Sequence, residues 1–498
     1  MNLSPPRKRW IFWIAAGVLL RLILIVFPGP TDDDTAVYLE LGHNLLHRGV
    51  YGIADGVSLP PSLFRLPGYP LFLATVELLF VRLWPNAWLN VVFILQAAAD
   101  LAGGLLLAAF ARRHLSARAA ELALALAMLC PFTAAYTGIA MTECLSVFAV
   151  SLAIYAAGRA LAAAGSLRRD PWALVLAGAA AALAMLLRPD GAILTFSLAA
   201  GLFAYTARSF VAPPRSSIRP HALGHGSMQA LRSAAASTAI FSAVALAPLL
   251  LWTARNWSDF HLFQPLAPRY VNDPGERVNL GFYRWMRTWS VDYVSTGNVF
   301  WNVGTENIDI GDIPARAFDS PQQYGQTAAL LADYNRYNGI WPELDARFAA
   351  LAAQRIRAHP LRYYLVLPVL RVADMVLRPQ TACFALDPYW WRWSDHPAQT
   401  AIAIFLGLIN LAYVALAAWA FLRRRVPWPW MLGGYLLLRF VLLSTMENPE
   451  PRYALECFPI LILAAAAALA PPAAASTKAL CQGTTSVVPQ TAQNMHGL

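Results

Sequence analysis

Apolar runs of about 20 residues recur along the whole chain, and each is long enough to cross the hydrocarbon core of a membrane as a helix. Only 13% of the 498 residues are charged, against roughly a quarter in soluble domains. This pattern excludes a soluble, disordered, collagen-like or coiled-coil protein and predicts an all-α polytopic membrane protein. The expected spans lie near residues 10–27, 88–111, 118–138, 144–163, 172–187, 190–207, 235–254, 399–422, 429–446 and 452–470.

Arginine distribution predicts which side each loop faces, because Lys and Arg accumulate in short cytoplasmic loops. Two further apolar stretches, 68–84 and 361–378, carry charges and are expected to lie at the interface without crossing. The first span is read as retained, since no small-residue cleavage site follows it. With about ten spans, both termini are cytoplasmic, as are the loops that contain Arg112, Arg113, Arg118, Arg168, Arg169, Arg208, Arg215, Arg219, Arg423, Arg424 and Arg425.

This topology divides the chain into four parts. Residues 1–254 form an N-terminal transmembrane module that includes an outer loop at 28–87. A large outer segment at 255–398 mixes Trp, Tyr, Asp and Arg with helical stretches such as 327–358, so we expect a folded cap. The remaining parts are C-terminal membrane helices at 399–470 and a disordered cytoplasmic tail at 471–498.

The net charge of +10 is explained by the cytoplasmic loops, and no nucleic-acid partner is expected. The five cysteines lack any CxxC spacing and imply neither a disulfide framework nor a zinc site. Arg21, Asp100 and Arg439 fall inside spans, where an unpaired charge costs several kcal/mol. Structural pairing is the favoured interpretation, and a transport path is the alternative.

The first outer loop opens with Thr31-Asp32-Asp33-Asp34, just before a helical pattern. One carboxylate there is explained equally well as a helix N-cap. Three carboxylates exceed what a cap needs, and a carboxylate beside the membrane can accept a proton from a hydroxyl or coordinate a cation.

Further charged motifs are predicted to meet on the same outer face. Arg188, in Arg188-Pro189-Asp190-Gly191, opposes the positive-inside trend; binding a lipid phosphate and snorkelling to head groups are equal explanations. Glu143 and the stretch from Glu447 to Tyr453 lie at outer ends of spans. Acids and bases therefore converge on one side of the membrane.

Together these motifs resemble GT-C membrane glycosyltransferases, most closely the protein mannosyltransferase and aminoarabinose transferase branch. The matching motifs are Asp34 with Tyr38, Glu40, Leu46, Gly49 and Tyr51; Arg65-Leu66-Pro67-Gly68-Tyr69-Pro70; Leu187-Arg188-Pro189; Pro248 through Trp252-Thr253-Ala254-Arg255-Asn256; His359-Pro360; and Glu450-Pro451-Arg452-Tyr453.

The resemblance implies a GT-C-like bundle and a catalytic base at Asp34. It also implies that Arg65, Arg188 and, less strongly, Arg452 contact the donor phosphate. Many relatives have Glu after the Asp, whereas this chain has Thr35. The expected substrate-binding set is Asp33, Tyr38, Glu40, Arg65, Glu143, Arg188, Glu450, Arg452 and Tyr453, with no role assigned to Glu143.

The resulting hypothesis is a bacterial inner-membrane glycosyltransferase that moves a sugar, with inversion, from a polyprenyl phosphate to an acceptor hydroxyl on the periplasmic side. The acceptor is left open among a glycolipid, a glycan and a protein. No cofactor is expected, and the three Asp leave open whether a divalent metal assists, although a phosphate that faces several arginines does not require one. The alternative is a transporter or flippase of lipid-linked glycans. Aromatic faces for an acceptor glycan, or core and interfacial positions, are offered by Trp285, Trp289, Tyr293, Trp301, Tyr389, Trp390 and Trp391.

Overall fold

The fold is all-α, as predicted. The computed structural model describes residues 5–30, 33–85, 87–163, 170–211 and 223–471. Within these residues the chain forms no strand, and Gly52 and Pro61 make one isolated antiparallel bridge. The predicted tail lies outside the described residues, apart from Pro471.

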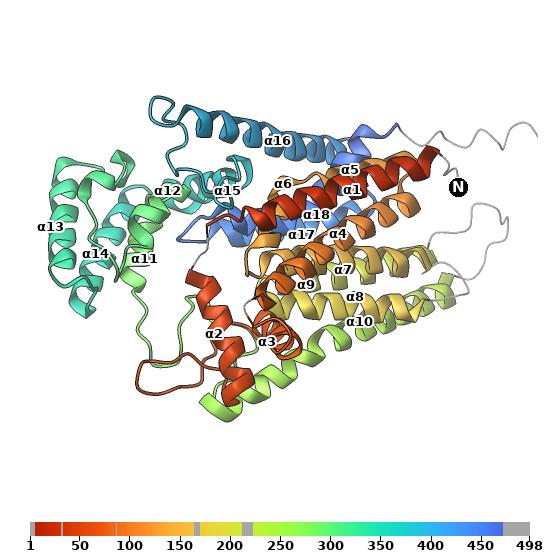
Figure 1. Ribbon diagram of the computed structural model, residues 1–498, viewed down its shortest axis with the longest axis horizontal. Helices are drawn as coiled ribbons and strands as arrows, with labels where there is room; N and C mark the ends of the chain where they lie inside the picture. Colours follow the sequence, from red (N-terminus) through yellow and green to blue (C-terminus); the bar gives the residue numbers. More distant parts are fainter. Residues whose placement is uncertain (1–4, 31–32, 86, 164–169, 212–222, 472–498) are drawn as a thin grey trace, which may run out of the picture.

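The bundle contains helices at all ten positions where spans were predicted. Its elements are α1 (Pro5–Val26), α4 (Trp88–His114), α5 (Ala117–Met128), α6 (Pro131–Ala135), η1 (Tyr136–Gly138), α7 (Glu143–Ala163), α8 (Pro171–Leu187), α9 (Gly191–Val211), α10 (Leu223–Phe260), α16 (Pro397–Leu422), α17 (Pro429–Ser444), η6 (Pro451–Cys457) and α18 (Phe458–Leu469). Figure 1 shows these long helices running side by side, with the start of α1 and the end of α16 at the same end of the bundle.

Seven described helices are long and apolar enough to cross a membrane, and the bent pair formed by α5 with α6 and η1 makes eight. α8 and α17 have only 17 and 16 residues. The count of ten therefore stays a prediction.

The expected single span at 118–138 is wrong in one respect, because the helix breaks in its middle. α5 ends at Met128, and a second helical piece begins at Pro131 with a bend of 41°. Proline lacks the amide proton that would continue the first helix and disfavours helical geometry in the residue before it, here Cys130. Both α5 and the pieces after the break, α6 and η1, pack against α1.

Two shorter helices lie across the end of the bundle opposite the N-terminus, α2 (Asp33–Arg48) and α3 (Gly68–Phe80). α3 has 13 residues, too few to cross a bilayer of about 30 Å. Its crosswise orientation in Figure 1 agrees with the interfacial position expected for 68–84.

The large segment extends beyond the same end of the bundle and has its own apolar core, built around Trp285, Trp289 and Phe348. The predicted helix at 327–358 is instead two helices, because Asn338 adopts a left-handed conformation between them. The elements of this segment are α11 (Leu280–Met286), α12 (Tyr293–Ser295), η2 (Thr296–Phe300), η3 (Ile310–Asp312), η4 (Ala315–Ala317), α13 (Pro321–Tyr337), α14 (Pro342–Ala358), η5 (Arg362–Val366) and α15 (Leu367–Leu377).

The charges inside the bundle pair locally. Arg21 Nη2 lies 2.6 Å from Asp100 Oδ2, and its guanidinium also donates to the carbonyl of Ala127 at 3.1 Å. This contact joins α1, α4 and the end of α5, as the structural interpretation predicted. Arg439 does not join this pair and reaches a different cluster at the end of the bundle.

Candidate active site

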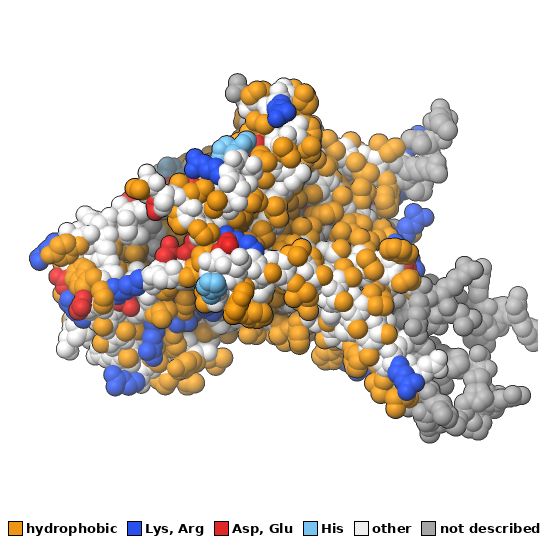
Figure 2. Space-filling model, turned by 90° about the horizontal axis from the view of Figure 1, so that it is seen from below, with side chains coloured by type: hydrophobic (Ala, Val, Ile, Leu, Met, Phe, Trp, Pro, Cys, Tyr) orange, Lys and Arg blue, Asp and Glu red, His pale blue; other side chains and the backbone are white. Residues whose placement is uncertain are grey.

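Four charged side chains from distant parts of the sequence meet at the end of the bundle that faces the large segment. Asp34 comes from the first turn of α2, and Arg65 from the loop before α3. Arg188 follows the last residue of α8, and Arg452 lies in η6. In Figure 2, acidic and basic side chains gather around a hollow in this half of the molecule, whereas apolar side chains cover most of the bundle.

Asp34 is bracketed by two guanidinium groups. Its Oδ1 forms an ion pair with Arg65, and its Oδ2 lies 3.1 Å from Arg452 Nη2. The Arg65 backbone is fixed by the hydroxyl of Tyr51, which donates to its carbonyl at 3.1 Å, and the Arg65 guanidinium lies over the ring of Tyr38. Burial raises the pKa of Tyr38 above its ordinary value. Asp34 is one-fifth exposed, so a substrate can reach it.

Arg188 is held by three carboxylates. Its guanidinium nitrogens lie 2.9 Å from Glu143, 3.1 Å from Glu456 and 3.5 Å from Asp190. Arg439 completes the cluster, pairing with Asp190 at 2.9 Å and with Glu456. Burial alone would lower the pKa of Arg188, but the carboxylates of Glu456, Asp190 and Glu143 raise it above its ordinary value. Arg188 is therefore charged, and the neighbouring carboxylates compensate its positive charge.

A cavity of about 430 Å³ opens between these groups, and we call it the arginine cavity. It is lined by Asp34, Tyr38, Phe64, Arg65, Leu66, Glu143, Leu187, Arg188, Pro189, Asp190, Ile193, Leu266, Ala267, Pro268, Arg269, Val271, Leu442, Leu443, Met446, Arg452 and Tyr453. The charged lining combines four arginines with the carboxylates of Asp34, Glu143 and Asp190. The apolar lining comes from the ends of α8, α9 and α17 and from the loops at 64–66 and 266–271.

A second cavity of about 360 Å³, the aromatic cavity, lies on the other side of Asp34 and Arg452. Its lining is Pro30, Asp34, Tyr136, Ile139, Met141, Tyr293, Trp301, Ala382, Cys383, Glu450, Pro451 and Arg452. Asp34 and Arg452 line both cavities. The ion pair that they form is thus a shared wall. Four arginines line the cavity on one side, whereas Arg452 is the one arginine in the lining on the other side, beside Tyr136, Tyr293 and Trp301.

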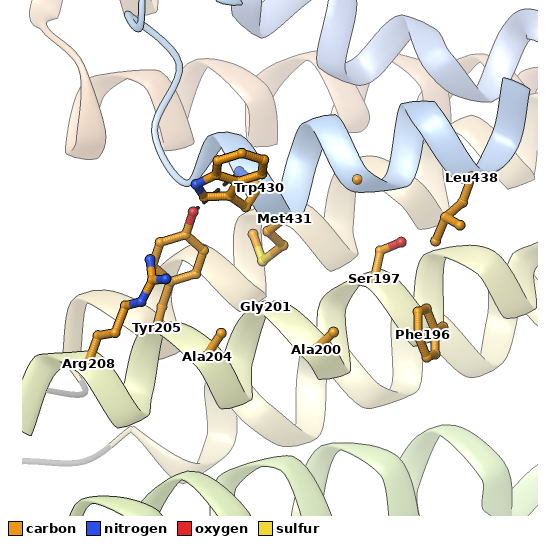
Figure 3. Close-up of a pocket in the computed structure, with 11 residues that line it drawn as sticks. Phe196, Ser197, Ala200, Gly201, Ala204, Tyr205, Arg208, Trp430, Met431 and Leu438 are labelled. Carbon is orange, nitrogen blue, oxygen red and sulfur yellow. Dashed lines mark hydrogen bonds between the residues drawn. The ribbon is translucent and has the colours of Figure 1, made fainter.

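A groove of about 290 Å³ runs between α9 and α17. Figure 3 shows Phe196 and Ser197 of α9 and Leu438 of α17 towards one end, with Arg208 and Trp430 at the other. Its lining continues that of the arginine cavity along both helices, from Ile193 on α9 and from Leu442 on α17. Arg208 is its one charged lining residue, so the groove offers an apolar track and no acid–base chemistry.

The sequence profile of the family described as dolichyl-phosphate-mannose-protein mannosyltransferase matches residues 67–215. The chain resembles this family. The matched part is less than half of the chain, and it includes α3 and the Arg188 motif. The resemblance predicted from the motifs is confirmed, and no match was found among curated protein sequences.

Two solved structures are similar at low identity. The oligosaccharyltransferase AglB from Archaeoglobus fulgidus, in complex with an inhibitory peptide and a dolichol-phosphate, is 14% identical with a TM-score of 0.48; the match covers 93% of this chain and 50% of that one. ArnT from Cupriavidus metallidurans, bound to undecaprenyl phosphate, is 15% identical with a TM-score of 0.38, covering 92% and 77%. The chain thus spans half the length of AglB, and neither TM-score reaches 0.5.

Most of the predicted site residues lie together. Asp34, Tyr38, Arg65, Glu143, Arg188, Arg452 and Tyr453 line the arginine cavity. Glu450 lines the aromatic cavity instead, with Oε2 at 2.5 Å from Arg452 Nε. The Tyr453 hydroxyl lies 3.3 Å from Glu450 Oε1 and accepts from Asn448 at 3.1 Å. The roles of these residues stay predictions.

One of the predicted residues lies outside both cavities. Glu40 lines neither cavity; its Oε1 accepts from the backbone amide of Ala54 at 2.8 Å and so holds the outer loop. Thr31, Asp32 and the Asp33 side chain lie outside the described residues. Among the aromatic residues, Tyr293 and Trp301 line the aromatic cavity, whereas Trp285 and Trp289 are fully buried in the core of the large segment.

Sequence reasoning missed Glu456, Asp190 as an acidic partner, and Arg269. Glu456 is an isolated acid within an apolar run, and this feature of the sequence could have identified it as a site residue. Arg269 lines the arginine cavity and lies 3.2 Å from Glu447. Arg269 belongs to the large segment, which contains many other arginines. Nothing in its local sequence therefore distinguished it from them.

Proposed function

We propose that the protein is a membrane glycosyltransferase that moves a sugar from a polyprenyl-phosphate carrier to an acceptor hydroxyl. The observation that carries this proposal is that Asp34 lines two cavities of different character. A transferase with two substrates needs them on opposite sides of one reacting centre. Its base must reach the acceptor, and its cations must reach the leaving group.

The arginine cavity suits the donor. Guanidinium groups bind phosphate through paired, charge-assisted hydrogen bonds, and Arg65, Arg188 and Arg452 all line the cavity. The apolar α9–α17 groove begins where the cavity ends. From Ile193 to Arg208 it follows α9 for roughly 22 Å, a path for several units of a polyprenyl chain. The name of the matched family supports a lipid-phosphate sugar as donor.

The aromatic cavity suits the acceptor. Tyr136, Tyr293 and Trp301 supply ring faces and polar edges against which a sugar ring or another hydroxyl-bearing group can pack. Trp301 is about half exposed, so the cavity is open towards the large segment. A glycolipid, a glycan and a protein hydroxyl are all compatible with this lining.

The reaction follows from this arrangement. The acceptor oxygen attacks the anomeric carbon and forms the new glycosidic bond, while the bond from that carbon to the phosphate oxygen breaks. The hydroxyl proton passes to Asp34, and the electron pair leaves with the polyprenyl phosphate, whose charge is stabilised by Arg65, Arg188 and Arg452. Attack opposite to the leaving group inverts the anomeric centre. We place the reaction on the periplasmic face of a bacterial inner membrane.

Structural pairing of the intramembrane charges disfavours the alternative, a transporter or flippase. Arg21 and Asp100 satisfy each other inside the bundle, and Arg439 binds Asp190 and Glu456 near the cavity. A transport path requires polar groups available to the cargo at mid-membrane. In this protein the accessible charges lie at the end of the bundle.

The decisive experiment uses the purified full chain in proteoliposomes with a polyprenyl-phosphate sugar. Mass spectrometry follows released polyprenyl phosphate and sugar-bearing acceptor. Asp34→Asn keeps the volume and one oxygen that can accept hydrogen bonds from the neighbouring arginines, but it cannot take the proton, so transfer should fall roughly 100-fold or more. The matched control is Asp55→Asn, in the same loop and outside both cavities, which should keep transfer.

Two outcomes would remove the proposal. If the wild-type protein moves intact lipid-linked sugar across the bilayer without releasing polyprenyl phosphate, the protein is a flippase. If Asp34→Asn transfers sugar at the wild-type rate, Asp34 serves only to position Arg65 and Arg452, and the two-cavity mechanism is wrong.

A further inference from the structure

A cluster of two histidines and one glutamate lies between α2 and α3, outside both cavities. His43 Nδ1 is 3.0 Å from Glu77 Oε1, and His47 Nε2 is 2.9 Å from the same oxygen. The three ligand atoms all lie within 4.8 Å of one another. No other group of this kind with three or more His, Cys, Asp or Glu side chains occurs among the described residues.

Glu77 is an unusual residue for its position. It is the one charged side chain of α3, whose other residues are apolar apart from Tyr69 and Thr75, and it is only 6% exposed. Burying a carboxylate is costly unless a cation or hydrogen-bond donors compensate it. Both imidazoles direct a ring nitrogen at the same carboxylate oxygen, so three potential metal-ligand atoms are grouped around one point.

The histidines are four residues apart on α2, so both rings project from the same face of the helix. Their centroids are 4.3 Å apart. The same spacing on a helix presents two imidazoles to zinc in metalloproteases. Both side chains are about half exposed, which gives a metal ion access from solvent and leaves room for a water ligand.

The distances also suit a metal. With nitrogen and oxygen ligands at about 2.0–2.2 Å from zinc, neighbouring ligand atoms of a tetrahedral site lie roughly 3.3–3.5 Å apart. The two nitrogen–oxygen separations are slightly shorter than this, so a small rotation of each imidazole admits the ion.

We propose that His43, His47 and Glu77 bind one divalent transition metal, with Zn²⁺ as the preferred ion and water completing its coordination. Two imidazoles and a carboxylate match the ligand preferences of Zn²⁺, whereas Mg²⁺ and Ca²⁺ prefer oxygen ligands alone. The metal would clip α2 to α3, and these are the helices that present Asp34 and follow Arg65. Its role is to fix the site geometry, since none of its three ligands lines either cavity.

The test measures metal binding directly on the full chain in detergent, purified with a tag that contains no histidine. After removal of metal with a chelator, Zn²⁺ is added back, and bound zinc is measured by mass spectrometry. The wild type should bind one more zinc per chain than His43→Ala/His47→Ala, and Co²⁺ should give the visible absorption of a four-coordinate site. Glu77→Gln should weaken binding by at least the roughly 10–100-fold that the loss of an outer-shell partner costs.

His396→Ala is the matched control. His396 also lies beside a carboxylate, 3.5 Å from Asp387, but without a third ligand, so this variant should bind zinc as the wild type does. Zinc should raise the unfolding temperature of the wild type and the control, raise that of Glu77→Gln less, and leave that of His43→Ala/His47→Ala unchanged. Equal zinc content in the wild type and the double variant, or a wild type that retains no zinc at micromolar concentration, would overturn the proposal.

Discussion

Arg65 and Arg188 face the same cavity but differ in how their charges are balanced. Among the described carboxylates Arg65 pairs with Asp34, whereas Arg188 contacts three. We expect Arg65→Ala to lower the affinity for a polyprenyl-phosphate sugar by about ten-fold or more, because it removes a charge-assisted contact of roughly 1.5–3 kcal/mol. Equilibrium binding to the purified protein measures this loss.

Arg188→Ala should weaken donor binding and also destabilise the protein, because Glu143, Glu456 and Asp190 lose a shared cation. Breaking a buried ion pair typically costs about 3–5 kcal/mol, which thermal unfolding would detect. Arg48→Ala, at the exposed end of α2, is the control for both measurements. Unchanged donor affinity in Arg65→Ala would contradict the assignment of the phosphate site.

Asp374 is expected to make the stability of the protein depend on pH. Burial raises its pKa from the ordinary 3.8 to about 6, and Arg378, at 3.5 Å, offsets this only in part. Because the pKa is raised in the folded state, the folded protein favours the protonated carboxyl. The contribution of Asp374 to stability is therefore fully present below about pH 4 and is lost as the pH rises through 6. Asp374→Asn should therefore be more stable than the wild type at pH 8, by on the order of 2 kcal/mol.

The unfolding temperature measured from pH 4 to pH 8 checks this prediction. The difference between Asp374→Asn and the wild type should shrink towards pH 4. Asp55→Asn should change stability with pH in the opposite direction, because hydrogen bonds from Ser58 and Val57 lower the pKa of Asp55. Its stabilising effect is present at neutral pH and is lost as the pH falls. A difference for Asp374→Asn that does not change with pH would show that its carboxyl is charged throughout.

Residue types predicted which side chains belong to the site better than they predicted which of them form ion pairs. The arginines, Glu143 and Tyr453 were expected on one face because each opposes the local trend in charge or matches a family motif. The pairing of Arg439 with Glu456 was not predicted, since it depends on how η6 folds back against α17. A charge within an apolar run signals a partner, but the sequence does not say which one.

At the level of elements, the junction between α3 and α8 sets the distance between the two phosphate-site motifs. A Cβ atom added to Gly68, the first residue of α3, would lie 2.6 Å from the carbonyl oxygen of Leu186. Backbone atoms must move to relieve this contact. We expect Gly68→Ala to separate Arg65 from Arg188 and to reduce donor affinity several-fold.

Gly325→Ala is the matched control for Gly68→Ala, because no atom lies within 4 Å of the added Cβ on α13. Replacing this helical glycine should leave donor binding unchanged and increase stability slightly, by roughly 0.5–1 kcal/mol. Donor affinity in Gly68→Ala equal to that of the control would show that the junction tolerates the extra methyl group.

Periodicity and length predicted where helices occur, but not where they break. Apolar residues continue through 117–138, yet the proline at 131 ends one helix and starts another. Within 327–358, Asn338 produces a break that composition alone does not reveal. α10 extends beyond the predicted 235–254 because its polar ends still favour helix once the apolar middle has formed.

The whole molecule has two ends with different compositions. α2, α3 and the large segment lie at one end, and the start of α1 and the end of α16 lie at the other. The arginine-rich connections predicted to be cytoplasmic follow α4 and α16, which places them away from the two cavities. The proposed function depends on this polarity, because the donor phosphate, the acceptor and Asp34 must share one aqueous compartment.

Thiol labelling of intact cells tests the polarity of the whole molecule. In a background without the native cysteines, Asp55→Cys and Gln322→Cys should react with an impermeant reagent, because the first lies in the outer loop and the second on the exposed face of α13. Arg113→Cys and Arg423→Cys, in the opposite connections, should react only after the cells are permeabilised. All four positions are exposed, so a failure to react cannot be attributed to burial. Labelling of Arg423→Cys but not of Gln322→Cys in intact cells would invert the topology and place the reaction on the cytoplasmic face.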